Sequence, residues 1–88
     1  MSADVNMRLT IRLQELLDEE LPGFATASNP EHTAAGMHVL ANATAAVLAG
    51  VDARLGTVMG DMVYTQWQAK VVRSREAIGA LVRKELAH

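Results

Sequence analysis

The stretch from Ala34 to Val63 constrains the fold most, because it is a long run of alanine, glycine and aliphatic residues with helical periodicity. At about 100° per residue its large apolar side chains fall within an arc of roughly 120°, which predicts the core-facing side of a helix. A second row beside them contains only alanine and glycine. The large apolar face comprises Met37, Leu40, Thr44, Val47, Leu48, Val51, Leu55, Val58, Met59 and Met62, and the small row comprises Ala41, Ala45, Ala49, Ala53, Gly56 and Gly60.

The small row has two interpretations. Alanine is the best helix former, so it can simply fill half-exposed positions of a helix. Alternatively, side chains this small let a second helix approach more closely than the usual ~8 to 10 Å, within one chain or between two chains. On the second interpretation we expect an interface in which a tryptophan is the anchor, because tryptophan is common among residues that dominate binding energy. The expected interface residues are Ala45, Ala49, Gly56, Gly60 and Trp67.

The composition of the 88 residues favours helices over sheets. Half of the residues are hydrophobic, but only Phe24, Tyr64 and Trp67 are aromatic, so a core has to be built from leucine, valine, methionine and alanine. We therefore expect one all-α domain over 1–88, a small bundle of two or three helices. A chain of this size is marginally stable alone, which favours a homo-dimer or a higher oligomer.

The first helix is predicted over about 3–20, and Pro22 and Gly23 end it, because proline cannot continue a helix and glycine accepts a positive φ. A linker follows over about 22–29, in which Phe24 is the one large apolar residue. We expect its ring to fold back onto the helices.

The second helix is predicted to begin near residue 30. Asn29 can act as the N-cap with Pro30 as the first helical residue. The alternative is Ser28 as the N-cap, with Glu31 closing a capping box three residues later.

The chain then either turns between Gly56 and Asp61 or continues as one long helix to the C-terminal end. A turn is favoured by three glycines, each costing about 1 kcal/mol in a helix, and by Asp61 as a natural N-cap. The apolar row that begins at Val63 is also rotated by roughly 150° from the row that ends at Met62. A turn predicts helices over about 30–55 and 61–87. A single long helix would instead need a partner chain, as in a coiled coil.

Charge is distributed unevenly, although the formal net charge is only −2. Residues 1–31 carry six acids and two bases, whereas 61–88 carry five bases and three acids. This asymmetry can align an antiparallel dimer or a head-to-tail assembly. The basic side chains either form a solvated helix exterior or a stripe that binds phosphates or an acidic partner. They are Lys70, Arg73, Arg75, Arg83 and Lys84.

No arrangement of residues indicates catalysis, a metal site or a cofactor. The chain has no cysteine, which excludes a thiolate nucleophile and a disulfide framework. His32 and His38 lie on opposite sides of a helix, and so do Asp52 and Asp61, so neither pair converges on one site. We therefore predict that the protein is not an enzyme and needs no cofactor.

Residues 32–51 carry no formal charge if the histidines are neutral. This uncharged segment of twenty residues has the length of a membrane span. Thr33, His38, Asn42 and Thr44 interrupt the run and alanine adds little hydrophobicity, so we expect no membrane insertion and a cytoplasmic protein.

These features together predict a non-enzymatic module for protein–protein interaction that associates with itself and with an unidentified protein partner. An adaptor, an inhibitor or an assembly component would fit, and a phage or another mobile element is one source we consider. The alternative is a helical nucleic-acid-binding module that uses the basic C-terminal segment.

Overall fold

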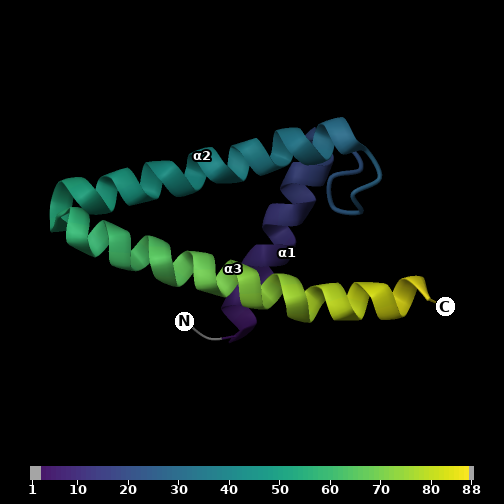
Figure 1. Ribbon diagram of the computed structural model, residues 1–88. Helices are drawn as coiled ribbons and strands as arrows, with labels where there is room; N and C mark the ends of the chain where they lie inside the picture. Colours follow the sequence, from purple (N-terminus) through teal and green to yellow (C-terminus); the bar gives the residue numbers. More distant parts are fainter. Residues whose placement is uncertain (1–2, 88) are drawn as a thin grey trace. The chain divides into compact units, whose positions relative to one another are not determined.

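The computed structural model describes residues 3–87, and this part of the chain forms three α-helices and no strand (Figure 1). Helix α1 spans Ala3–Glu20, α2 spans Pro30–Leu55 and α3 spans Thr57–Leu86. The all-α prediction is confirmed, and the first two helices have the predicted bounds.

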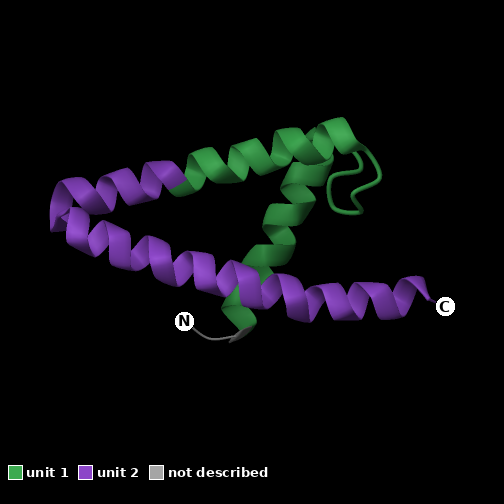
Figure 2. Cartoon of the chain, in the orientation of Figure 1, with its two compact units in different colours: residues 1–44 green, residues 45–88 purple. Residues whose placement is uncertain are grey.

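Contacts within the chain divide it into two compact units, which Figure 2 distinguishes by colour. Unit 1, residues 1–44, contains α1, the connecting segment and the first half of α2. Unit 2, residues 45–88, contains the second half of α2 and α3.

In unit 1 the connection after α1 turns at Gly23, which has a φ of 91°. The Ser28 N–H donates to the Gly23 carbonyl at 3.0 Å and closes the turn. The Asp18 carboxylate accepts hydrogen bonds from the N–H groups of Gly23 at 3.2 Å and Ala25 at 3.0 Å. Asp18 therefore supports the connecting segment, although an acid near a helix C-terminus is electrostatically unfavourable in isolation.

Helix α2 begins as one of the two capping patterns predicts. The Asn29 side-chain oxygen accepts a hydrogen bond from the His32 N–H at 3.2 Å, so Asn29 is the N-cap and Pro30 is the first helical residue. The His32 ring also contacts the connecting segment, because its Nδ1 lies within hydrogen-bond distance, 2.7 Å, of the Pro22 carbonyl oxygen.

Phe24 folds back onto α2, as predicted. Its ring lies so close to Gly36, which is buried, that a Cβ at this position would overlap the ring carbons Cδ1 and Cε1. The absence of a side chain at Gly36 therefore allows the connecting segment to pack against the helix.

In unit 2 the chain turns at a single residue, Gly56, with φ 94° and ψ 159°. This conformation is essentially restricted to glycine. Helical hydrogen bonding runs up to the Gly56 N–H, which donates to the Asp52 carbonyl at 3.0 Å, and resumes with the Gly60 N–H, which donates to the Gly56 carbonyl at 3.1 Å.

The alternative of one long helix is therefore wrong, and the predicted turn is present (Figure 1). The predicted start of the third helix is four residues late, because α3 begins at Thr57. Asp61 lies inside α3 and does not cap it.

Candidate interaction surface

The most unusual feature of the described chain is how much apolar surface it exposes. Among residues 3–87, Leu17 is the one large apolar side chain that is buried, with 7% exposed. Twenty-one other large hydrophobic side chains are at least 37% exposed. The large apolar face was expected to form a core, but Met37 is 55% exposed and both Val47 and Leu55 are 66% exposed. That face is therefore mostly surface.

The row of small residues is interrupted by the turn. Ala45 and Ala49 lie exposed on α2, whereas Gly56 is the turn residue between α2 and α3. Gly60 is buried in α3.

The close contact at Gly60 is made within unit 2. A Cβ at Gly60 would overlap the carboxylate oxygen Oδ1 of Asp52 and lie 2.9 Å from its Cγ. Sequence reasoning missed this pair. Asp52 and Gly60 are each four residues from Gly56, so a turn placed at Gly56 would have indicated that they meet.

The expected anchor, Trp67, is 44% exposed and stacks on Tyr64, which is 42% exposed. Their ring centroids are 5.9 Å apart and their planes differ by 17°. Both side chains lie on α3 one turn apart, so the stacked pair offers an aromatic surface that is half open to solvent.

The apolar row of α3 extends beyond the helix that accompanies it in unit 2. The part of α2 in this unit covers residues 45–55, about 16 Å at 1.5 Å per residue. Helix α3 has 30 residues and is about 45 Å long. Its last half therefore has no covering helix within its own unit.

The basic side chains of α3 are all exposed, but they do not form one stripe. At about 100° per residue, Lys70, Arg73 and Lys84 fall within an arc of roughly 60°. Arg75 and Arg83 point in other directions around the helix. The structure thus groups three of the five predicted basic residues and separates the other two.

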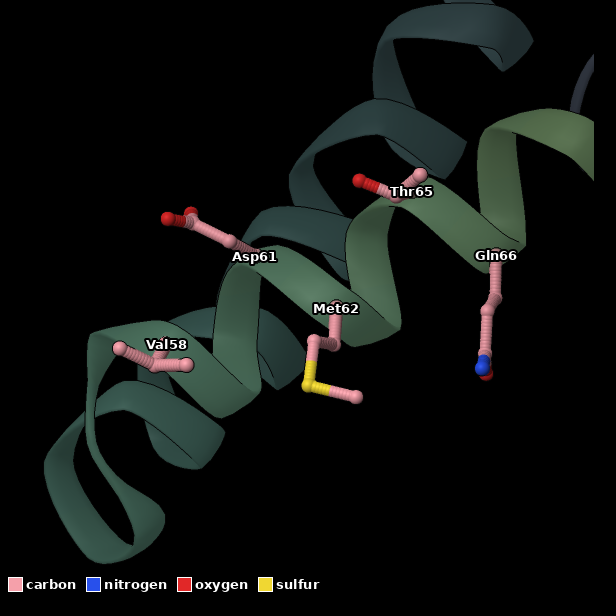
Figure 3. A pocket seen from close by; sticks show the side chains of 5 residues that line it. All are labelled: Val58, Asp61, Met62, Thr65 and Gln66. Carbon is pink, nitrogen blue, oxygen red and sulfur yellow. The ribbon is translucent and has the colours of Figure 1, made fainter.

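Three surface hollows among residues 3–87 offer no convergent chemistry. One lies on α3, and Figure 3 shows that its five side chains do not point toward a common centre; they are Val58, Asp61, Met62, Thr65 and Gln66. Two others are each lined by a single helix, one by α1 and one by α2. Within residues 3–87 no three histidine, aspartate or glutamate side chains gather where they could hold a metal ion.

Helix α2 is long and apolar enough to cross a membrane by length and composition, with a mean hydropathy of 1.5 in its most apolar part. The core helix of a soluble protein has the same properties. The prediction of no membrane insertion, which rests on Asn42 and the other polar residues of this helix, stays a prediction.

The chain was compared with protein-family models, with curated proteins and with solved structures. None of them matches it. The candidate surface is therefore defined within each unit by its own residues. In unit 1 these are the exposed apolar side chains of α1 and the first half of α2, and in unit 2 those of the second half of α2 and of α3, which also carries the Tyr64 and Trp67 pair and the basic residues.

Proposed function

We propose that this chain is a non-enzymatic helical module that associates with copies of itself and holds another protein on the apolar surface that remains. The observation that carries the proposal is the exposure of twenty-one large hydrophobic side chains among the described residues, against one that is buried. Burying apolar surface stabilises by roughly 25 cal/mol per Å². Exposed apolar side chains in this number are typical of surfaces that meet a partner.

A helical partner fits the spacing of these side chains. On α3 they recur at steps of three and four residues, the pattern by which one helix packs on another. The hollows have little polar lining that converges on a point, which supports interaction over catalysis. An adaptor, an inhibitor of another protein or an assembly component would act in this way, in the cytoplasm.

Nucleic-acid binding is the second candidate, and one observation favours it: Lys70, Arg73 and Lys84 share one side of α3 and are exposed. Such binding depends on neutralising phosphates and weakens steeply with added salt. The proposal of protein interaction is preferred because far more apolar than basic side chains are exposed.

The solution mass tests the proposal. Light scattering after size-exclusion chromatography at about 10 and 100 µM should give at least twice the chain mass of 9.5 kDa. A mass of one chain at both concentrations would remove self-association. The same preparation, mixed with lipid vesicles or with duplex DNA at low salt, should bind neither. Flotation with vesicles would instead assign the apolar surface of α2 to a membrane.

A further inference from the structure

We propose that the last half of α3 is the docking surface for α1 of a second copy of this chain, in antiparallel orientation, with Glu19 of one copy beside Lys70 of the other. This inference rests on the proposed function, because it specifies which surfaces self-association uses. Four properties of the two helices support it: length, charge, spacing and exposure.

The lengths match. Within unit 2 the accompanying part of α2 is about 16 Å long and α3 is about 45 Å long, so about 29 Å of α3 has no helix of its own unit beside it. Helix α1 has 18 residues and is about 27 Å long. One copy of α1 therefore suffices to cover the remaining length.

The charges are complementary. Helix α1 carries five acidic and two basic residues, a formal charge of −3. Residues 70–86 of α3 carry five basic and two acidic residues, a formal charge of +3. Two copies of α3 would repel each other. By contrast, α1 and α3 attract each other both during approach and in the complex.

The apolar rows also match. On α3 the row is Val71, Ser74, Ile78 and Leu81, and on α1 it is Leu9, Leu13 and Leu16. Both alternate steps of three and four, the spacing that interlocks two helices. Apart from Ser74, which is half-buried, these side chains are 44% to 64% exposed.

The orientation follows from aligning the rows. When the helices run antiparallel with Leu16 beside Val71, Leu9 lies beside Ile78. The next flanking positions then bring Glu19 next to Lys70, and both of these side chains are exposed. A parallel alignment of the same rows brings no opposite charges together at the flanking positions, so it is disfavoured.

Two copies can form this contact twice. In a two-fold symmetric dimer each copy gives its α1 to the partner and receives the partner's α1 on its own α3, so the buried area doubles. Such reciprocal burial supplies the apolar contacts that each described unit lacks.

A charge reversal tests the pairing. The dimer dissociation constant is measured by sedimentation equilibrium for the wild type, Lys70→Glu, Glu19→Lys and the variant with both changes. Each single change should weaken the dimer by about tenfold, because it turns two attractive pairs into repulsive ones. The double change should restore most of the affinity.

An apolar pair on one helix gives a matched control. Ile78 and Val72 are both 57% exposed, but they lie about 120° apart around α3. Ile78→Asp should weaken the dimer by about a hundredfold or more, and Val72→Asp should leave it nearly unchanged. Circular dichroism checks that each variant keeps its helix content.

The outcomes separate the two levels of the proposal. The α1–α3 pairing would be overturned, and self-association left intact, by either of two results. One is a dimer dissociation constant that the charge reversals do not change, and the other is an equal change in Ile78→Asp and Val72→Asp. A wild-type monomer at all concentrations would overturn both. If the protein is a monomer whose thermal stability falls in each single charge variant and is restored in the double variant, the pairing lies within one chain. That result would overturn the role of the second copy.

Discussion

The pair of variants Gly36→Ala and Gly50→Ala measures how tightly the connecting segment packs on α2. Both glycines lie inside α2, where alanine is favoured over glycine by about 1 kcal/mol. A Cβ at Gly50 meets nothing within 4 Å, so this variant should gain the whole of that amount. A Cβ at Gly36 would overlap two carbons of the Phe24 ring and lie 3.1 Å from a third, Cζ.

The ring of Phe24 must therefore move, and overpacking of this kind costs about 1 to 3 kcal/mol. The expected gap in unfolding free energy between the two variants is about 1 to 3 kcal/mol, with Gly50→Ala the more stable. In thermal unfolding followed by circular dichroism this gap corresponds to at least about 4 °C for a chain of this size. All samples are measured at one protein concentration, because self-association would shift the midpoint. Equal gains for both variants would refute the packing of Phe24 on Gly36.

Substitutions at three further positions test the connections. Gly56→Ala should destabilise the turn by about 1 to 3 kcal/mol and favour one continuous helix. Small-angle scattering would detect the continuous helix as a larger maximum dimension of the molecule. An unchanged maximum dimension would contradict the role of Gly56. Asp18→Ala should lose about 1 to 2 kcal/mol in urea unfolding because two amide donors lose their acceptor, while Asp18→Asn keeps most of the stability; equal losses would argue against these hydrogen bonds. Ala27→Gly should gain up to about 1 kcal/mol because Ala27 has a φ of 54°, and a loss would count against that conformation.

The helix ends near the connecting segment could be predicted because their causes are local. Pro22 and Gly23 stop α1, and Asn29 with Pro30 starts α2, through contacts that span only a few residues. The hydrogen bonds from Gly23 and Ala25 to Asp18 could not be predicted, because they depend on the path of a connection that has no regular structure.

The start of the third helix was predicted four residues late for a related reason. Gly50, Gly56 and Gly60 are equally able to interrupt a helix, so local propensity does not choose among them. With the turn at Gly56, the missing side chain of Gly60 leaves room for the Asp52 carboxylate, a contact between helices that local propensity does not include. A break at Gly60 would have lost that close approach.

Helical periodicity identified which apolar residues share a side, but not whether the chain itself covers them. Leu40, Leu48 and Val51 are half-buried on α2, while Val47 and Leu55 are 66% exposed. The pattern is the same for a face buried in a core and for a face that meets another chain. The candidate surface therefore emerges from the exposure of residues that the sequence alone assigns to a core.

We expect copies of the chain to associate through their exposed apolar helix surfaces. Hydrogen exchange tests this association best when it is measured at two protein concentrations, one above and one below the midpoint of dimer dissociation. Mass spectrometry of proteolytic fragments follows the amides of α1 and of residues 71–86. We predict that protection of both segments rises with concentration, while protection of residues 22–29 changes little. Protection of α1 and of 71–86 that is the same at both concentrations would contradict the account.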